Sequence, residues 1–290
     1  MDTASPFISP AELAPLLGRA DAPLLLDVRR RERFAASDTL LAAARWCAPE
    51  AVAALVADEP ARDVVVYCAY GHEVSQDAAQ ALRAAGWRAR FLRGGIHGGE
   101  AGVDPQGDVD AWRAVPLPKV RKRPDLGVTG ESTSCWVTRA RPKIDRIACP
   151  WLILRFIDPR ARFFFVPEGE VQAQATRLQA TPFDAAGCAI THAWERCSFD
   201  ALLQAFALQA PGLAALATIV RAADTDRLAL APPAAGLLAI SLGLSRLHAD
   251  DDAAMLAAAL PLYDALYAWC REGQGETHRW TTHDFQKAAA

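Results

Sequence analysis

A cysteine separates an apolar run from a helix-like stretch in the first half of the sequence. Residues 64–76 read VVVYCAYGHEVSQ, so Cys68 directly follows a pattern typical of a buried strand. A thiol is nucleophilic as the thiolate, and the N-terminus of a helix lowers its pKa. The residues that follow are Ala69, Tyr70, Gly71, His72 and Glu73. Backbone N–H groups in such a loop predict a cradle for an anionic sulfur or a small anion. The alternative is an inert, buried thiol.

A second set of reactive side chains lies in the second half. Asp145 and Cys149 are four residues apart and share a face if their helix is continuous. His192 lies in a strand-like run and Glu195 just beyond it, and Asp224 ends an apolar helix pattern. Imidazole and carboxylates, with a thiolate from Cys149 or Cys197, would suit a divalent transition metal such as zinc, iron or manganese.

Two other interpretations of this second set remain open. The spacing H-x-x-E arises easily by chance, so His192, Glu195 and Asp224 also fit hydrogen-bonded or helix-end roles. Arg139 and Arg146, with Arg141 between them, offer charge-assisted hydrogen bonds to a tetrahedral oxyanion instead.

Residues 23–113 contain the elements that must position Cys68. Buried strands are predicted at 23–28, 63–68 and 87–92, and helices at 49–59 and 75–86. Strands that alternate with helices indicate an α/β unit with a parallel sheet. Asp27 and Arg29, at the end of the first strand, are predicted to form a structural pair.

Residues 115–133 hold three prolines and four basic residues, which predicts a linker with solvated charges. The remainder is predicted to be a helix-rich α+β domain. Its expected strands are 134–139, 161–166 and 188–194. Its expected helices are 142–158, 170–180, 198–208, 212–224, 234–247 and 253–272. Pro150 should kink the first helix or begin it anew, and Ser198 is the expected N-cap of the third. The domains are therefore placed at 1–114 and 134–290.

The amino-acid composition and net charge limit the classes of protein to which this chain can belong. The formal charge of −3 gives no general electrostatic footprint for nucleic acid, although a local basic surface is compatible with it. Seven cysteines without CxxC spacing favour reduced thiols in a cytoplasm. The N-terminus lacks a signal-peptide pattern, and the apolar run 232–245 is too short to span a bilayer. We therefore expect a cytoplasmic protein without a membrane segment.

The first domain resembles the rhodanese family. The segments LLLDVR at 24–29, CAYGHE at 68–73 and LRGGIHGGEAG at 92–102 carry the resemblance, which extends over residues 8–114. It implies a sulfurtransferase-like domain in which Cys68 carries a persulfide between a small sulfur donor and a thiol acceptor. Glu73 departs from the family pattern: its carboxylate is expected to repel thiosulfate and raise the thiol pKa. A protonated His72 would offset this.

The second domain resembles the C-terminal domain of the ChrB family of chromate-resistance proteins. The resemblance lies in residues 136–159, 163–171, 181–184, 191–203, 219–227 and 262–270, in the family's order. It implies a role in resistance to, or sensing of, chromate or a related oxyanion or metal stress. The fusion of the two domains also fits variants of that family.

Two functional hypotheses follow. In the first, a sulfurtransferase-like domain works with a metal- or oxyanion-binding domain in chromate resistance. In the second, the chain is a chromate-responsive regulator that binds DNA or a partner protein without catalysis. Its contact surface would be the basic clusters at 121–123 and 139–146, although no helix-turn-helix pattern is evident.

Overall fold

The first half of the chain folds around a parallel sheet. The computed structural model describes residues 5–276. The sheet order is β1-β6-β5-β2-β4, and every neighbouring pair is parallel. The strands are β1 (Phe7–Ile8), β2 (Leu24–Asp27), β4 (Ala44–Trp46), β5 (Asp63–Tyr67) and β6 (Arg88–Leu92). The expected strands and parallel sheet are confirmed, with two short edge strands added.

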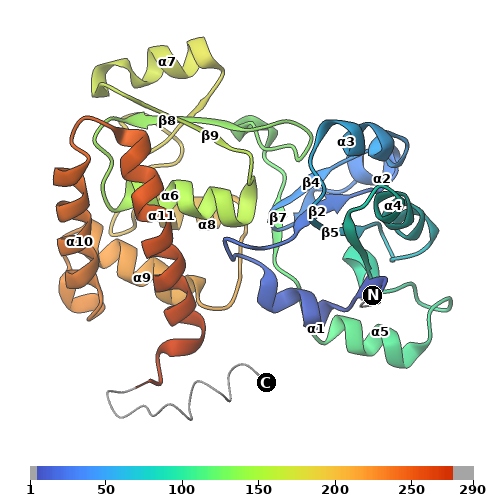
Figure 1. Cartoon of the computed structure of the whole chain (residues 1–290). Helices are drawn as coiled ribbons and strands as arrows, with labels where there is room; N and C mark the ends of the chain where they lie inside the picture. Colours follow the sequence, from blue (N-terminus) through green and yellow to red (C-terminus); the bar gives the residue numbers. More distant parts are fainter. Residues whose placement is uncertain (1–4, 277–290) are drawn as a thin grey trace.

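Helices cover both faces of this sheet (Figure 1). The helices are α1 (Pro10–Leu13), α2 (Arg31–Ala35), α3 (Val52–Asp58), α4 (Glu73–Ala84) and α5 (Gln106–Arg113). Val64 and Val66 pack with α3 and α4, whereas Val65 packs on the opposite face with α1. Burial of these valines on both faces explains why β5 reads as an unbroken apolar run. Because β5 ends at Tyr67, Cys68 is delivered to the carboxyl edge of the sheet.

The second half combines a small parallel sheet with many helices. Its sheet order is β10-β8-β9, from β8 (Cys135–Arg139), β9 (Arg162–Val166) and β10 (Thr181–Pro182). The helices are α6 (Asp145–Leu152), α7 (Val171–Leu178), α8 (Ser198–Ala205), α9 (Leu213–Asp224), α10 (Ala234–Leu247) and α11 (Asp252–Ala268). Trp136, Trp151 and Tyr263 lie in its core. The expected helix-rich α+β class is confirmed.

Three local predictions differ from the structure. Residues 188–194 form no strand, only isolated bridges such as Phe183 to Ile190. Helix α6 continues through Pro150 into a π-helical segment, Ile153–Ile157, so of the two alternatives for Pro150 the new start is wrong. The N-cap of α8 is Cys197, and Ser198 is the first helical residue.

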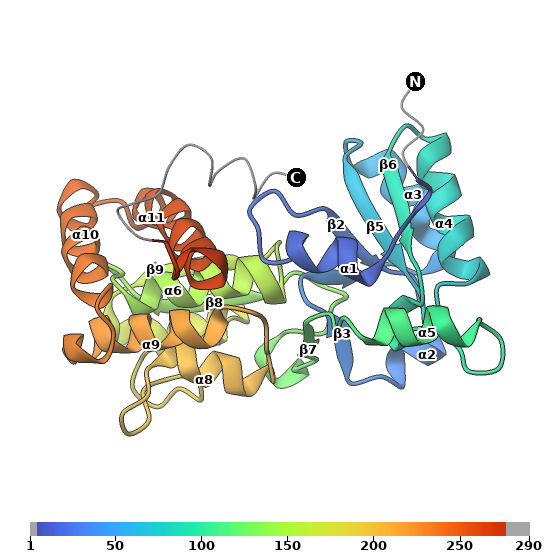
Figure 2. The same cartoon turned by 90° about the horizontal axis from the view of Figure 1, so that it is seen from below.

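The segment 115–133, predicted to be a solvated linker, is folded between the two halves (Figure 2). Its strand β7 (Lys119–Arg121) pairs antiparallel with β3 (Thr39–Leu41), and Val120 is fully buried. The N–H of Arg121 donates to the carbonyl of Phe206 at 2.9 Å. The Lys122 ammonium lies 3.3 Å from the centroid of the Phe34 ring. The basic run therefore joins the two halves and is only partly available to solvent.

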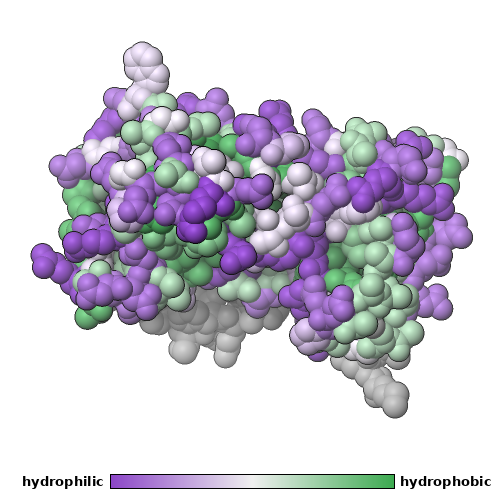
Figure 3. Space-filling view, turned by 90° about the horizontal axis from the view of Figure 1, so that it is seen from above, coloured by the Kyte–Doolittle hydropathy of each residue, from purple (hydrophilic) through white to green (hydrophobic). Residues whose placement is uncertain are grey.

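One long helix resembles a membrane span by length and composition. Residues Asp252–Gly273, which comprise α11 and a π-helical end, meet that test. A single such helix is weak evidence, because apolar core helices meet the same criterion. Tyr263 and Tyr267, on one side of α11, are buried and lie near Trp151 of α6, although only 28% of the apolar window of this helix is buried. On the face in Figure 3, hydrophilic residues are spread over both halves.

Direct packing also joins the two halves. The N–H of Ala43 donates to the carbonyl of Phe156 at 2.6 Å. Gly18, with φ of +78°, faces the same phenylalanine: an added Cβ would lie 2.2 Å from its Cζ. Glycine is therefore required at position 18 both for its backbone angle and for the close approach of Phe156.

We predict that Gly18→Ala lowers the midpoint of thermal unfolding more than Gly86→Ala. Gly86 has a similar φ of +86°, but none of the described residues lies within 4 Å of an added Cβ there. Gly86→Ala should cost about 1–2 kcal/mol of strain. Gly18→Ala should cost about 1–3 kcal/mol more, because the methyl group displaces Phe156. Differential scanning calorimetry measures both, and equal midpoints would contradict this packing of the two halves.

Candidate functional site

A buried carboxylate, that of Asp145, anchors the polar cluster of the second domain. Asp145 begins α6 and is 1% exposed. Its Oδ2 accepts the N–H of Ser198 at 2.7 Å, and its Oδ1 accepts the N–H of Phe199 at 3.0 Å. These are the first N–H groups of α8, so the carboxylate lies at the positive end of that helix dipole.

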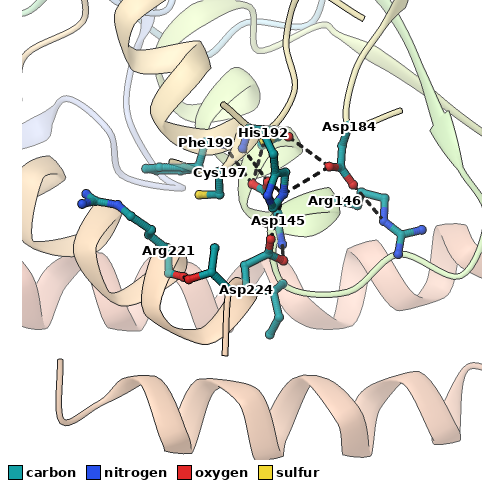
Figure 4. A network of polar contacts seen from close by, with 12 residues as sticks. Asp145, Arg146, Asp184, His192, Cys197, Phe199, Arg221 and Asp224 are labelled. Atoms are coloured by element: carbon teal, nitrogen blue, oxygen red, sulfur yellow. Dashed lines mark hydrogen bonds and ion pairs between the residues drawn. The ribbon is translucent and has the colours of Figure 1, made fainter. Parts of the chain in front are cut away.

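The imidazole of His192 faces three carboxylates (Figure 4). Its Nε2 lies 3.0 Å from Asp224 Oδ2, 3.3 Å from Asp145 Oδ2 and 3.5 Å from Asp184 Oδ1. Asp224, at the end of α9, also accepts the N–H of Asp145 at 3.3 Å. The His192 side chain is 40% exposed, whereas Asp145 and Asp184 are buried. The cluster is therefore reached from solvent on the His192 side.

Sequence reasoning missed Asp184, which completes this cluster. One ligand atom from each of Asp145, Asp184 and His192 lies within 4.8 Å of the others. Asp184 occupies an irregular segment with φ of +48°, so no helix or strand periodicity marks it. The sequence offered one indication that Asp184 matters: it follows the residues TPF in a segment that carries the family resemblance.

Arg139 and Arg146, the candidate oxyanion ligands, hold Asp184 instead. Arg139 Nη2 lies 2.9 Å and Arg146 Nε 3.2 Å from Asp184 Oδ2. The Ser198 hydroxyl donates to Asp184 Oδ1 at 3.0 Å. Arg146 Nη1 donates further to the carbonyls of Arg139 and Ala140. These contacts fix the orientation of the carboxylate and occupy the arginines.

Electrostatics favour a positive charge at the centre of the cluster. The hydrogen bond to Asp145 and the nearby carboxylates raise the pKa of His192 to about 9, against the effect of burial. Burial and the charge of Asp145 raise the pKa of Asp224 to about 7. The raised pKa keeps a proton on His192 near neutral pH, and a divalent cation bound by this imidazole would replace it.

The two candidate thiols lie beside the cluster as neutral groups. Cys149 Sγ donates to Asp145 Oδ1 at 3.2 Å, as the four-residue spacing predicts for a continuous helix. Burial, with the charge of Asp145, raises its pKa well above the usual range. Cys197 Sγ lies 3.6 Å from Asp200 Oδ2, and burial raises its pKa as well. Neither environment favours the thiolate that ligation or reduction chemistry requires.

Glu195 lies outside the cluster. Its side chain is 78% exposed and its Oε2 lies 3.0 Å from Arg227 Nη1. Ala193 and Arg196 pair across a tight turn in which Trp194 has φ of +58° and is fully exposed. The predicted H-x-x-E ligand pair is thus corrected: the turn separates the two side chains.

The Cys68 loop has the predicted strand–loop–helix geometry. Cys68 follows β5, is 7% exposed, and has its Sγ 3.2 Å from Ser75 Oγ in α4. Gly71 has φ of +81°. The carbonyl of Cys68 accepts the N–H of Ile96, and an added Cβ on Gly95 would lie 2.5 Å from that oxygen. The turn after β6 therefore closes the back of the loop.

A cavity of about 270 Å³ opens over Cys68. Its lining includes Glu73, as predicted, together with Arg29 and two arginines that sequence reasoning missed, Arg30 and Arg33. His72 Nε2 lies 3.1 Å from both Asp104 carboxylate oxygens, and its Nδ1 lies 3.6 Å from Glu100. Arg29 is neutralised by Asp27, but the exposed Arg30 and Arg33 add positive charge to the same lining as the Glu73 carboxylate. Repulsion of anionic donors by Glu73 therefore stays a prediction.

Arg29 has a structural role as well. Its Nη2 lies 2.5 Å from Asp27 Oδ2, and both side chains are buried. A second Nη2 contact, 2.9 Å to the carbonyl of Thr39, ties this pair to β3. The predicted structural pair is confirmed.

Comparisons with known proteins agree with both resemblances. Residues 9–101 match the family model "Rhodanese-like domain", and residues 136–270 match "ChrB, C-terminal domain". Protein ChrB from Cupriavidus metallidurans is 35% identical over 133 residues, which are 46% of this chain and 39% of that protein. The chain thus spans well under half the length of this relative.

Two solved structures are similar to parts of the chain. A rhodanese homologue from Thermus thermophilus is 34% identical, with a TM-score of 0.27, over 32% of this chain and 98% of that one. The As-Sb reductase from Leishmania major is 19% identical, with a TM-score of 0.29, over 40% of this chain and 86% of that one. The family models identify residues 9–101 as a rhodanese-like domain, in keeping with its sheet order, and residues 136–270 as a ChrB C-terminal domain.

Proposed function

We propose that this protein acts in chromate resistance in the cytoplasm. Its second domain binds a divalent transition metal through Asp145, Asp184 and His192, and its first domain carries sulfur on Cys68. The observation that carries the metal site is the convergence of these three ligand atoms within 4.8 Å, from separate segments of the chain. The role in chromate resistance rests on the likeness to ChrB.

The residues present fit such a metal. One imidazole and two buried carboxylates form a nitrogen–oxygen donor set that suits zinc, iron or manganese. Asp224, 3.0 Å from His192, is placed to accept a proton or to serve as a further ligand. A metal bound here would supply Lewis acidity, and iron or manganese would also supply redox capacity. The half-exposed His192 ring leaves an open side for a small molecule.

The first domain would transfer a sulfur atom through Cys68. The Cys68 thiolate attacks the outer sulfur of a donor, the bond to the donor breaks, and the donor leaves with its electron pair. An acceptor thiolate then takes that sulfur and releases the Cys68 thiolate. The Ser75 hydroxyl lies 3.2 Å from Cys68 Sγ and would turn from the carbonyl of His72 to donate to the thiolate, while Arg30 and Arg33 of the cavity lining would attract an anionic donor.

The alternative hypothesis, a regulator that binds DNA, has less support from the contacts of its basic residues. Arg123 forms an ion pair with Asp125, and Lys122 packs against Phe34. Arg139 and Arg146 are bound to Asp184. These four side chains of the two basic clusters are thus engaged within the protein, whereas Arg121 and Arg141 are exposed.

We predict that Asp184→Asn abolishes stoichiometric metal binding. Arg146→Gln should weaken binding about 10- to 100-fold, because it no longer orients the Asp184 carboxylate. Glu195→Gln is the matched control and should bind as wild type does, since Glu195 lies outside the cluster. Calorimetric titration of chelator-treated protein with zinc and manganese measures all three. Loss of binding in Glu195→Gln, or full binding in Asp184→Asn, would refute this ligand set.

We predict that Cys68→Ala removes persulfide formation and sulfur transfer completely. Ser75→Ala should keep the persulfide but slow its formation, because the thiolate loses a hydrogen-bond donor. Mass spectrometry after incubation with thiosulfate or an organic persulfide detects the added sulfur atom. Cys47→Ala is the control, because that thiol lies outside the Cys68 loop. A persulfide that forms equally well in Cys68→Ala would exclude the proposed carrier.

We predict that His192 stabilises the metal-free protein at low pH and loses this effect as pH rises. Its folded-state pKa of about 9 exceeds the unfolded value of 6.5. Stabilisation is therefore complete below about pH 6.5 and disappears as pH passes about 9. Urea unfolding of wild type and His192→Gln should differ most below pH 6.5 and converge above pH 9. A difference that grows with pH would contradict the protonated cluster.

A further inference from the structure

A second, arginine-lined cavity lies at the boundary between the two domains. Its volume is about 440 Å³. Arg45, Arg62 and Arg88 approach it from the first domain, near the amino ends of β5 and β6. Arg155 and Arg160 approach it from the second domain. Cys68 lies at the carboxyl edge of the same sheet, so this cavity is separate from the sulfur site.

Positive charge dominates the lining. Six arginines contribute to it, Arg19 being the sixth, against two aspartates, Asp21 and Asp63. Some of the carboxylates that pair with these arginines do not line the cavity themselves. When they are counted too, the six guanidinium groups are paired with five carboxylates of the described residues. These carboxylates are Asp21, Glu59, Asp63, Asp158 and Asp264. Arg45 and Arg62 share Glu59, so positive charges outnumber their partners by one within residues 5–276.

Two buried guanidinium donors that belong to lining residues lack an acceptor within the described part of the chain. Arg45 is 9% exposed; its Nη1 lies 2.6 Å from Glu59, but its buried Nη2 has no hydrogen-bond partner there. The buried Nε of Arg160 is likewise unpaired, and its closest ion-pair contact, to Asp158, is 3.6 Å long. Unsatisfied buried donors are uncommon in native proteins, and a missing ion is one established reason for them.

We propose that this cavity binds a small molecule that carries a tetrahedral dianionic oxyanion, of the phosphate or sulfate type. Guanidinium groups match such an oxyanion with paired charge-assisted hydrogen bonds. The cavity exceeds the size of a free oxyanion. Leu24, Leu154 and Pro159 line it alongside the arginines, which leaves room for a short apolar or ribose-like body.

A ligand in this position would contact both domains at once. Arg155 lies in the π-helical continuation of α6, whose first residue is Asp145 of the metal-binding cluster. A bound anion would therefore hold the two domains together at this boundary. It would also contact the C-terminal end of the helical segment that begins at Asp145. The inference rests on neither the proposed sulfur chemistry nor the proposed metal, and it can fail without affecting them.

Binding can be tested with sulfate, phosphate, chromate and adenosine monophosphate, each against sodium chloride at equal ionic strength. Thermal shift and calorimetry on the full chain report stabilisation and affinity. The chromate arm uses Cys68→Ala, which removes the loop thiol as a reductant. We expect at least one dianion to stabilise the protein well beyond chloride. The ligand that binds with the highest affinity shows whether the cavity takes a free oxyanion or a phosphorylated organic molecule.

Arg160→Gln and Arg62→Gln should each weaken that binding about tenfold or more, through loss of a charge-assisted hydrogen bond. Both side chains are partly exposed, so the fold should tolerate these changes. Arg177→Gln, on the exposed face of α7 and away from the cavity, is the charge-matched control. Stabilisation no greater than that by chloride would overturn the proposal. Equal weakening by Arg177→Gln would do so as well.

Discussion

The Asp145 carboxylate, buried at the N-terminus of α8, is the interaction on which the rest of the second domain depends. A buried charge is costly unless hydrogen bonds compensate it. Here the N–H groups of Ser198 and Phe199 do so, and the backbone N–H of Asp145 itself reaches Asp224. Through its side chain and its backbone N–H, Asp145 thus links α6 to α8 and α9. The same geometry presents an oxygen to His192.

The surrounding contacts hold this arrangement in place. Ile144, directly before Asp145, has φ of +21°, an unusual angle for a branched residue. The Tyr263 hydroxyl donates to the carbonyl of Ile144 at 2.8 Å, so α11 supports this conformation. Arg139 and Arg146 support Asp184 in turn. Strain and buried charge of this kind concentrate at functional sites, which is consistent with the proposed metal centre.

The two domains form one connected structure with separate chemistry. A single hydrophobic cluster includes Phe34 and Leu40 of the first domain, Val120 of the connecting segment, and the core of the second. Cys68 lies in a cavity lined by residues of the first domain, and the carboxylate cluster lies within the second. A sulfur carrier and a metal site on one chain would allow thiol chemistry and metal chemistry to respond to the same oxidative stress.

Regular patterns were the most predictable features of this chain. The unbroken apolar run at β5 and the glycine-containing loop after it were sufficient to place Cys68 correctly. Asp145 and Cys149 share a helix face, as their spacing predicted, because α6 continues through Pro150.

Long-range contacts in irregular segments were not predictable. Glu195 was misassigned because the H-x-x-E spacing cannot show that a turn at Trp194 separates the side chains. Asp184 was missed because its partners lie 38 and 45 residues earlier, at Arg146 and Arg139. The buried Val120 shows a third limit: a proline-rich, basic segment resembles a linker until its partner strand is known.

X-ray absorption spectroscopy of the zinc-loaded full chain tests the central claim most directly. The account predicts a shell of nitrogen and oxygen ligands at about 2.0–2.2 Å, with the signature of one imidazole from His192 and no sulfur. A sulfur shell at about 2.3 Å would show that Cys149 or Cys197 ligates the metal instead. That result would contradict the assignment of Asp145, Asp184 and His192 as the metal ligands.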